Sequence, residues 1–537
     1  MRASAREASR GTDRLLLFLC CLVLGVTVLY PALRLGVQAA THWQSGAILR
    51  GAGVAAIRNT LLLSLASVLC AGLVGSTLAV FLTRYSFPGR GVLSALAYLP
   101  FTLPPLVGVL SFYYLIGRDG VLLRLLQYFG LDNAAVPGPW AILLIHTYSF
   151  YVFFYAMVSA ALETLDRGPI EGARTLGAGR LRVFFRVTVP MLLPAVLGAA
   201  LLTFMSSGAS FSAPYFFGGD FPMLSVVIFN ERSQFNNDAA VTLTVVLGLV
   251  SLGGVLLFRG ARAAGGVASK GVRVPIRGRA GRVLAAVVAW LCVVVVLIPH
   301  VTIVWLSFVS YRDWHTEMIP WRMTLENYGT LFREVRAFRP ILNSLWMSGL
   351  ATAATLVVGL PAAYLIARRR PGCRWLNILV MIPWALPGTV IAMNLIVAFN
   401  DRWLPVYNTV WMLPLAYFVR SVPLLTRMAG AVIEPFDATL IEAGRTLGAP
   451  VLTCFRRIVL PLIAPAVAAG MALVFAMSLG EFVASILLYL PGNIPIAVQI
   501  NMEWRASVGA AFAYSVLLMG LAGAAFGVSG RFGARLL

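Results

Sequence analysis

Charged residues are scarce in this chain of 537 residues. Asp, Glu, Lys and Arg together make up 12% of the sequence, whereas 60% of the residues are hydrophobic and the mean hydropathy is +0.86. A water-soluble fold of this length cannot bury so much apolar surface. Several windows of about 20 residues carry few charges, and a helix of that length crosses a bilayer. The sequence therefore predicts an all-α integral membrane protein.

Lysine is nearly absent, since Lys270 is the only one and arginine carries almost all of the positive charge behind the net value of +22. A phosphate-binding loop of the form G-x-x-x-x-G-K-[ST] is excluded, because Gly271 follows that lysine. No H-E-x-x-H or G-x-S-x-G motif occurs either, so we expect no catalytic residues and no ATP hydrolysis by this chain. The basic residues lie in short loops between apolar windows, which argues against a nucleic-acid partner.

The cysteines and histidines of the chain do not form the patterns that disulfide frameworks or metal sites need. Six cysteines occur, none of them in a C-x-x-C motif, and the four histidines are scattered along the chain. The sequence therefore predicts no disulfide framework and no metal site. No cofactor is expected to bind to this chain.

The apolar residues are grouped into twelve windows. These are residues 15–34, 58–83, 92–116, 139–162, 192–217, 239–258, 283–308, 342–367, 375–399, 406–430, 463–489 and 509–528. Arginines are clustered in alternate loops, as at 167–186 and 368–374, whereas segments such as 230–238 carry mixed charges. Because cytoplasmic loops are enriched in Lys and Arg, we expect both termini in the cytoplasm.

The most informative feature is a polar phrase that occurs twice. Residues 171–190 read EGARTLGAGRLRVFFRVTVP, and 271 residues later 442–461 read EAGRTLGAPVLTCFRRIVLP. The order of other matches is also kept, with RNTLLLS at 58–64 against LNSLWMS at 342–348. We interpret this as a duplication of six spans. Residues 1–258 form the first repeat with a loop at 163–190, and 283–537 form the second with a loop at 434–461.

The segment between the repeats, 259–282, is rich in Gly, Ala and Arg and contains no acidic residue. It is predicted to be a flexible cytoplasmic linker that is solvated or touches anionic lipid. The two halves keep the same orientation, so the repeats are predicted to be parallel, related by an axis along the membrane normal.

Each phrase is predicted to form a short helix that ends in a turn. In the first copy Ile170, Ala173 and Leu176 favour one side of the helix, and Glu171 and Arg174 favour the other, as an i,i+3 pair. Gly177 and its counterpart Gly448 can end the helix, because glycine adopts positive φ without steric cost. An interfacial loop that only anchors the fold is the alternative interpretation.

The phrase resembles the EAA loop of permease subunits of binding-protein-dependent ABC importers. We call 163–190 the first EAA loop and 434–461 the second. The resemblance implies the fold of type I importers, with about 12 transmembrane helices and a cytoplasmic coupling helix in each repeat. It also implies that the coupling helices contact ATPase subunits. The residues that it assigns to this contact are Glu171, Gly172, Ala173, Arg174 and Gly177, and in the second copy Glu442, Ala443, Gly444, Arg445 and Gly448.

The resemblance extends to partners and location. It implies a pair of cytoplasmic ABC ATPase subunits, as a homodimer, that use the ATP. It also implies a periplasmic or lipid-anchored substrate-binding protein, and a place in the bacterial inner membrane. The resemblance thus implies that ATP hydrolysis by the separate ATPase subunits drives the permease between its inward-open and outward-open states. An ion-coupled secondary transporter is the alternative from another class, and it leaves the repeated phrase unexplained.

The sequence says less about the transported substrate than about the class of transporter. The segments ASFSAPYFFGG (209–219) and SLGEFVASILLYLPGNIPIAVQI (478–500) resemble the ferric-iron group, and the alternatives are importers of thiamine, polyamines or 2-aminoethylphosphonate. Glu481 is an acid inside an apolar window, where ionisable groups are costly. Glu481 and its counterpart Ser210 are therefore the candidates for the substrate path, with a structural hydrogen bond as the other interpretation of Glu481.

Overall fold

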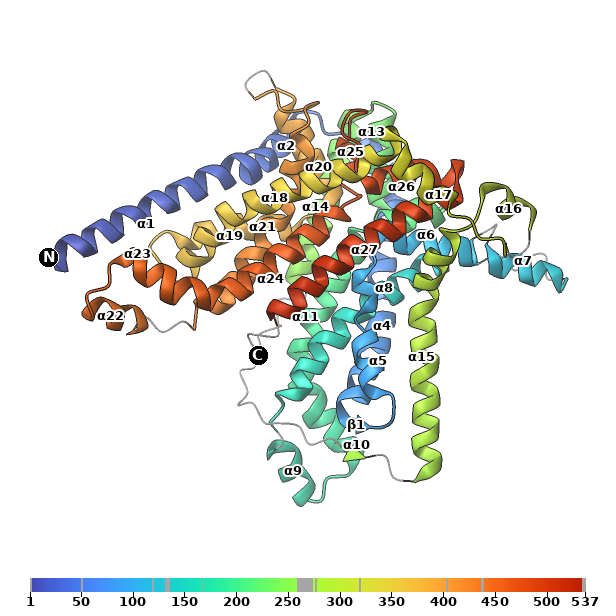
Figure 1. Ribbon diagram of the computed structural model, residues 1–537, viewed down its shortest axis with the longest axis horizontal. Helices are drawn as coiled ribbons and strands as arrows, with labels where there is room; N and C mark the ends of the chain where they lie inside the picture. The colour runs from blue at the N-terminus through green and yellow to red at the C-terminus, as the bar shows by residue number, and fades with distance from the viewer. Residues whose placement is uncertain are drawn as a thin grey trace. The chain divides into compact units, whose positions relative to one another are not determined.

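The computed structural model is almost entirely helical (Figure 1). It describes residues 2–49, 52–117, 120–130, 136–166, 168–257, 274–275, 278–317, 320–401, 404–435 and 439–533. Most of the predicted linker, 259–273 and 276–277, lies outside these residues. Strands in the described part amount to one parallel pair, β1 (Tyr85–Ser86) and β2 (Val274–Pro275).

The elements of the first half follow one another as α-helices with three short turns of other helix types. They are α1 (Arg2–Leu24), the π-helix η1 (Gly25–Leu29), α2 (Tyr30–Thr41), α3 (Ser45–Leu49), α4 (Gly53–Arg84), α5 (Arg90–Leu96), the 3-10 helix η2 (Leu99–Thr102), α6 (Pro105–Ile116), α7 (Val121–Tyr128), α8 (Gly138–Glu163), α9 (Gly168–Thr175), α10 (Arg180–Val183), the π-helix η3 (Phe184–Thr188), α11 (Val189–Gly208), α12 (Ser212–Phe217), α13 (Leu224–Ser233) and α14 (Asn237–Leu257).

The second half has a similar order with fewer short elements. Its elements are α15 (Arg279–Leu306), α16 (Tyr311–Thr316), α17 (Glu326–Arg333), α18 (Val335–Ala367), α19 (Cys373–Ala385), α20 (Gly388–Phe399), α21 (Met412–Ile433), α22 (Thr439–Thr446), α23 (Val451–Cys454), the π-helix η4 (Phe455–Val459), α24 (Leu460–Leu479), α25 (Ser485–Leu488), α26 (Ile496–Ala506) and α27 (Val508–Gly533).

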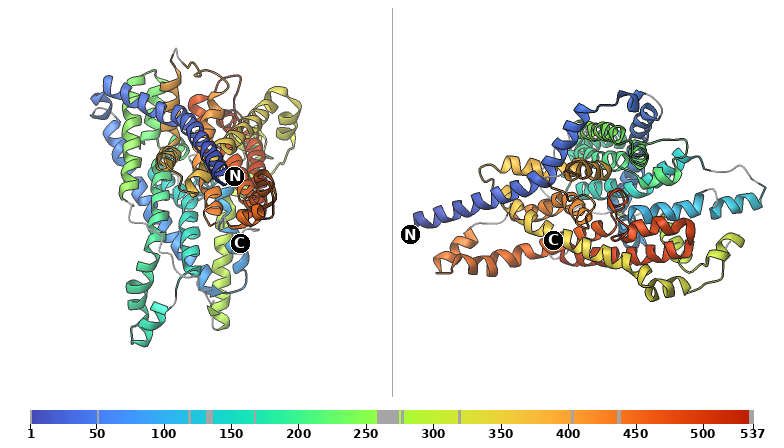
Figure 2. Two further views of the ribbon diagram at one scale, coloured as in Figure 1. Left: turned by 90° about the vertical axis from the view of Figure 1, so that its left-hand side faces the viewer. Right: turned by 90° about the horizontal axis from the view of Figure 1, so that it is seen from above.

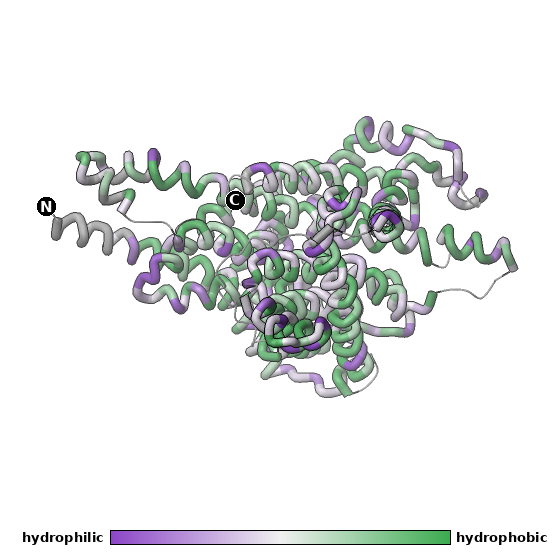
Figure 3. Tube along the Cα trace, turned by 90° about the horizontal axis from the view of Figure 1, so that it is seen from below, coloured by the Kyte–Doolittle hydropathy of each residue, from purple (hydrophilic) through white to green (hydrophobic). Residues whose placement is uncertain are grey.

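Ten helices in the described residues are long and apolar enough to cross a membrane, or eleven if the bent pair α19 and α20 counts as one span. Apolar residues dominate the long helices in Figure 3, with polar residues gathered mainly at their ends and in the connections. The sequence predicted about twelve. The window 406–430 corresponds to α21, which is not among the ten and carries Arg420 and Arg427.

Two further windows are shorter in the structure than predicted. The window 192–217 ends as a helix at Gly208, and 463–489 ends as a helix at Leu479. In both cases a break of a few residues separates the long helix from a short one, α12 or α25. Ser210 and Glu481 therefore lie in these breaks and not inside a helix, which corrects the prediction for Glu481.

A broken helix occurs at the same place in both halves. The break precedes α6 at Leu103-Pro104 and α20 at Leu386-Pro387, and α19 and α20 are bent by 113°. The two leucines have extended backbones, with ψ of 118° and 133°. Because a proline disfavours helical backbone in the residue before it, the Leu-Pro pair explains each break.

The chain forms two compact units that do not coincide with its sequence halves. Unit 1 comprises Met1–Trp43, Ser307–Tyr311 and Arg322–Leu537, and unit 2 comprises Gln44–Leu306 and Arg312–Trp321. The first long helix of each half thus belongs to the unit built mainly from the other half. The half boundaries at 258 and 283 stay a prediction about the sequence repeat.

In unit 2 the long helices α4, α8 and α11 pack side by side, and α15 lies along the same unit (Figures 1 and 2). The α15 helix contributes Ala285, Ala289, Val293 and Val296 to a buried cluster with residues of α4, α5, α8 and α11. In unit 1 the corresponding group is α18, α21, α24 and α27, and α1 packs against α18 and α19.

The asparagine that opens an apolar window in each half holds a distant segment. Asn59 Nδ2 donates to the carbonyl of Pro222 at 3.1 Å, and Asn343 Nδ2 donates to that of Ile494 at 3.0 Å. Thr60, the residue after Asn59, caps α13, since the N–H of Leu224 donates to Thr60 Oγ1 at 3.1 Å. In the second half Ile496 N–H donates to Ser344 Oγ at 2.8 Å. The repeat is therefore present in the hydrogen bonds as well as in the sequence.

Candidate functional site

The first EAA loop lies at the end of the long helices of unit 2, where α9 carries the repeated phrase (Figure 1). The N–H of Gly168, the first residue of α9, donates to Asp166 Oδ1 at 2.9 Å, and this bond fixes the start of the helix. Thr175 Oγ1 donates within the helix to the carbonyls of Glu171 and Gly172, at 2.9 Å each. The polar residues of the phrase thus stabilise a helix of two turns.

The end of α9 is a Schellman motif. Ala178 N–H donates to the carbonyl of Ala173 at 3.0 Å, and Gly177 N–H donates to that of Arg174 at 2.9 Å. Gly177 adopts φ of +81°. These are the two bonds that define the motif, and they require a left-handed residue at the glycine position. The predicted turn at Gly177 is confirmed, whereas its contact with an ATPase stays a prediction.

The second EAA loop in unit 1 is built in the same way. The α22 helix ends with Ala449 N–H donating to the carbonyl of Gly444 at 3.0 Å, and Gly448 has φ of +83°. Ala443 is exposed and accepts a hydrogen bond from Thr446 Oγ1. The side chains of Glu442 and Arg445 lie outside the described part of the chain.

The faces of the helix differ from the prediction at one residue. Ile170 and Ala173 are half-buried as expected, and Glu171, Gly172 and Arg174 are exposed. Leu176 was predicted on the side of Ile170, but it is 89% exposed. It is the last residue before the turn, so its side chain is released from the face of the helix. Its counterpart Leu447 is also 89% exposed.

The charges of the first loop do not form the predicted pair. Glu171 and Arg174 are both exposed, and the ion pairs found among the described residues do not include them. Both side chains point into solvent and are free to meet charged groups of a partner. An exposed i,i+3 pair contributes only about 0.2–0.5 kcal/mol, so its absence costs the helix little.

The basic residues after each turn do not form a separate helix. In the first half Arg180–Gly208 is continuous and passes through η3 into α11, and α10 and η3 pack against α9. Val189 N–H donates to the carbonyl of Phe184, five residues back. In the described residues each π turn precedes a proline by two positions, at Pro31, Pro190 and Pro461. Because proline cannot donate to the carbonyl four residues back, a wider turn absorbs the missing bond.

Gly444 shows how closely the short helix packs on the long one. A Cβ atom at this position would lie 3.0 Å from Ile458 Cδ1 and 3.1 Å from Cys454 Sγ. The first half has Ala173 in place of Gly444, and Val187 in place of Ile458. The methyl group gained at Ala173 thus goes with a shorter side chain at Val187 on the facing turn. The short helix α22 is thereby held on the span that follows it.

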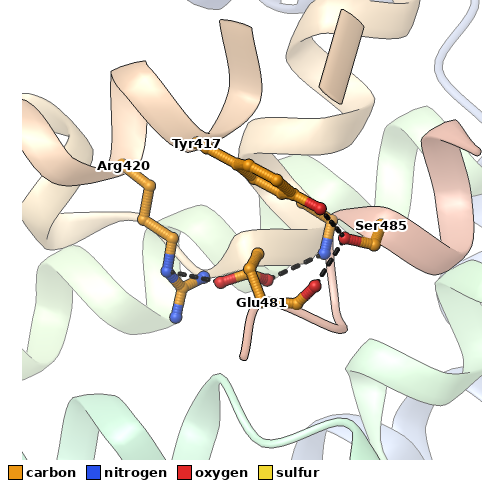
Figure 4. Close-up of polar contacts among 5 residues, drawn as sticks. Tyr417, Arg420, Glu481 and Ser485 are labelled. Atoms are coloured by element: carbon orange, nitrogen blue, oxygen red, sulfur yellow. Dashed lines mark hydrogen bonds and ion pairs between the residues drawn. The ribbon is translucent and has the colours of Figure 1, made fainter. Parts of the chain in front are cut away.

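A second group of polar residues surrounds Glu481 in unit 1 (Figure 4). Arg420 Nε lies 2.9 Å from Glu481 Oε2, and Glu481 Oε1 accepts the N–H of Ala484 at 3.0 Å. Ser485 Oγ donates to the Glu481 carbonyl, and Tyr417 is hydrogen-bonded to Ser485 at 2.7 Å. Glu481 therefore ties the break after α24 to α21.

The first half has a neutral network at the matching positions. Ser210 Oγ is 2.9 Å from His146 Nε2, and His146 is the counterpart of Tyr417. His146 Nδ1 is 3.1 Å from Ser67 Oγ and 3.0 Å from Ser207 Oγ. Both predicted path residues thus join α11 or α24 to the preceding long helix of their own unit.

Sequence reasoning missed Arg420, although the signal was present. An arginine near the middle of the apolar window 406–430 is a costly residue that needs a partner. The scarcity of acids in the apolar windows leaves Glu481 as the natural candidate. Sequence reasoning also placed Leu176 on the apolar side of the helix, although both phrases have a leucine directly before the turn, at 176 and 447.

Comparisons with known proteins give the family. The sequence model of a family described as "binding-protein-dependent transport system inner membrane component" matches residues 71–264 and again 355–537. The chain is 32% identical over 461 residues to the probable ABC transporter permease protein y4fN of Sinorhizobium fredii, across 83% of this chain and 81% of that protein.

Two other relatives carry named cargoes. The ferric transport system permease protein FbpB of Actinobacillus pleuropneumoniae is 27% identical over 483 residues, 87% of this chain and 69% of that protein. The sulfate transport system permease protein CysT of Salmonella typhimurium is 34% identical over 210 residues, 38% of this chain and 74% of that protein.

The double match covers both halves, and each match contains one EAA loop. Family membership decides against an ion-coupled carrier and against an enzyme, and it implies an ATPase and a periplasmic binding protein as partners. The chain belongs to the inner-membrane permeases of binding-protein-dependent ABC importers, as a fused protein with two permease repeats.

Proposed function

We propose that this chain is the permease of a ferric-iron importer and that each EAA loop docks on one subunit of an ATPase homodimer in the cytoplasm. The observation that carries the cargo assignment is the ferric permease relative, which matches 87% of the chain. Two further ferric permeases from Haemophilus influenzae match 81% and 80% of it. In this proposal the binding protein selects the cargo, and the permease provides a path that opens to each side in turn.

The docking role is supported by the shape of the loops. Each loop presents a short helix that ends in an αL glycine and carries a leucine that is 89% exposed. A single exposed leucine is unremarkable. Here two exposed leucines lie at matching positions of a repeat, each beside exposed polar residues. Each leucine forms a small apolar projection that fits a groove on a partner. Docking at both loops requires both termini in the cytoplasm, as the arginine distribution predicts.

An inorganic oxyanion is the second candidate cargo, because a sulfate permease is 34% identical over part of this chain. Thiamine, polyamines and 2-aminoethylphosphonate stay as alternatives from the sequence. The deciding experiment measures uptake of each radiolabelled compound in a strain whose own importers are deleted. Iron uptake that depends on this chain supports the proposal. Uptake of another compound, without iron, overturns the cargo assignment.

The docking role has its own test in the double variant Gly177→Leu and Gly448→Leu. A leucine forced into positive φ costs about 1–2 kcal/mol per residue, so both turns should rearrange. We expect uptake to fall about tenfold or more and the ATPase to be lost on purification. Insertion and abundance should be unchanged, because a Cβ at either glycine meets no atom within 4 Å.

Gly130→Leu is the matched control for this variant. Gly130 also has positive φ, +81°, and open space around it. It lies between the predicted apolar windows 92–116 and 139–162, so a cytoplasmic N-terminus would put it on the outer side. We expect it to keep wild-type uptake. Wild-type uptake in the double variant would remove the docking role and leave the loops as anchors.

A further inference from the structure

The ion pair of Arg420 and Glu481 is the strongest unexplained feature of unit 1. Arg420 lies near the middle of α21, and Glu481 lies in the break after α24. Charges at membrane depth are costly, and a buried pair does not in general stabilise a fold more than apolar residues would. The pair therefore calls for a role beyond packing.

The first half serves as an internal comparison, because it builds the same helices without these charges. Ser149 stands in place of Arg420, and Ser210 in place of Glu481. Ser210 still joins the break to the preceding helix through His146, at 2.9 Å. A neutral hydrogen bond is therefore sufficient to hold the break, and the fold does not require the ion pair.

The accessible member of the pair is the cation. Glu481 has a side chain only 7% exposed, and both of its carboxylate oxygens are engaged, by Arg420 and by the N–H of Ala484. The Arg420 side chain is 37% exposed. A guanidinium has five N–H donors in a planar fork, so donors remain after the bond from Nε. An approaching ion thus meets positive charge, with the negative charge behind it.

The backbone around Arg420 is broken and packs closely against the guanidinium. The broken helix places Gly388, the first residue of α20, against Arg420, and a Cβ there would overlap Nη1. Pro105 stands at the matching position of the first half. Thr389 Oγ1 and Ser478 Oγ, in adjacent segments, are buried and make no hydrogen bond in the described structure. Irregular backbone at membrane depth is tolerated where it is buried in protein or lines an aqueous cavity.

We propose that Arg420 receives an oxyanion group of the cargo, of the carboxylate, phosphate or sulfate type, during its passage. Glu481 holds the guanidinium in place through Nε, and the remaining N–H donors face the cargo. Arginine suits this task because its fork matches the geometry of an oxyanion and stays charged at every physiological pH. The inference rests on the proposed transport function. It implies that ferric iron would cross with an oxyanion ligand, because a bare Fe3+ ion is repelled by Arg420.

The test is the charge-swapped variant Arg420→Glu with Glu481→Arg in the full chain, expressed with its ATPase and binding protein. The swap keeps an ion pair but places the carboxylate at the accessible position. We expect cargo uptake to fall roughly tenfold or more, since the charge-assisted bond to the cargo is replaced by repulsion. The neutral variant Arg420→Gln with Glu481→Gln should raise KM for uptake and lower uptake less than the swap does.

The matched control is the swap Arg34→Asp with Asp401→Arg. This pair also lies in unit 1, with Arg34 Nη2 2.6 Å from Asp401 Oδ2, but both side chains are partly exposed, at 43% and 26%. Surface pairs contribute about 0–1 kcal/mol, so wild-type uptake is expected. Wild-type uptake in the Arg420 and Glu481 swap would show that only the ion pair matters and would overturn the proposal.

The outcomes also separate this inference from the cargo assignment. If the swap fails to accumulate in the membrane, the neutral variant decides by its KM at equal abundance, and an unchanged KM overturns the proposal. The wild-type chain is tested with radiolabelled iron supplied with citrate, and with radiolabelled sulfate. Uptake of sulfate alone would refute ferric iron and keep the oxyanion contact. Uptake of a purely cationic compound would refute both.

Discussion

Leu176 and Leu447 hold the same place in the two halves, directly after α9 and α22. Each precedes a glycine with positive φ and is 89% exposed. Truncating them removes almost no contact within the chain. Any effect of such a change therefore reports on a partner rather than on the fold.

We predict that Leu176→Ser together with Leu447→Ser weakens the complex with the ATPase. Fully burying a leucine contributes about 1.5–3 kcal/mol, so two should lower the affinity by roughly a hundredfold or more. The measurement is the dissociation constant for the ATPase with the chain in nanodiscs. Leu325→Ser is the control, because Leu325 is 69% exposed. It lies between the predicted apolar windows 283–308 and 342–367, so a cytoplasmic N-terminus would put it on the outer side. An affinity equal to wild type would mean that the leucines do not enter the interface.

At this scale the sequence predicted backbone roles better than side-chain partners. Gly177 and Gly448 were identified because positive φ is a local property that one residue determines. The pair of Arg420 and Glu481 was not, because the two residues lie 61 positions apart and meet only through the packing of α21 on α24. Leu176 was misplaced because helical periodicity does not hold at the last residue before a turn.

At the scale of elements, the outstanding feature is the cap that a long helix supplies to a distant short one. Thr60 on α4 accepts the first N–H of α13, and Ser344 on α18 accepts the first N–H of α26. All four residues are buried. A buried N–H that loses its acceptor costs about 1–3 kcal/mol, so the hydroxyl group is what each position needs.

We predict that Thr60→Val lowers the free energy of unfolding by about 1–2 kcal/mol, since its shape is kept and its hydroxyl is lost. Thr60→Ser should stay close to wild type, because the second half already uses Ser344 for the same bond. Thermal unfolding in detergent measures both. Equal stability of the two variants would show that another acceptor replaces Thr60.

The helix order was predictable, but the breaks after α11 and α24 were not. The apolar windows and the Pro and Gly residues between them located most of the long helices to within several residues. The breaks at Ala209–Phe211 and Gly480–Ala484 fall inside windows of high hydropathy, so composition gave no sign of them. They are held by Ser210 and Glu481, whose bonds to a neighbouring helix exist only in the folded unit.

At the scale of the whole molecule, compact units and sequence repeats have different boundaries. Unit 2 is completed by α15 from the second half, and unit 1 contains α1 and α2 from the first half. Sequence comparison finds only the duplication, because similarity between the halves says nothing about which helix packs where. A cut at the repeat boundary therefore removes from the buried cluster of unit 2 the four residues that α15 contributes to it.

We predict that a fragment of residues 1–306 resists protease better than a fragment of 1–258. The longer one contains α15, whose Ala285, Ala289, Val293 and Val296 pack on the other helices of unit 2. Within a bilayer such packing is the main source of helix association, so its loss should loosen α4, α8 and α11. Limited proteolysis in native membranes measures this. Equal digestion of the two fragments would mean that α15 is not needed for unit 2 to become compact.

The first helices of each half pack in the unit built mainly from the other half, and this affects the order in which contacts form during synthesis. The α1 and α2 helices leave the ribosome first, yet their contacts α18, α19 and α20 begin only at Val335. At about 5–20 residues per second, roughly 15–60 s of synthesis separate the end of α2 from the start of α18. During that interval the first span must remain in the lipid without its permanent neighbours. Its outward-facing Leu15, Phe18 and Leu22 suit such a wait, because lipid is the one surrounding in which they need no partner.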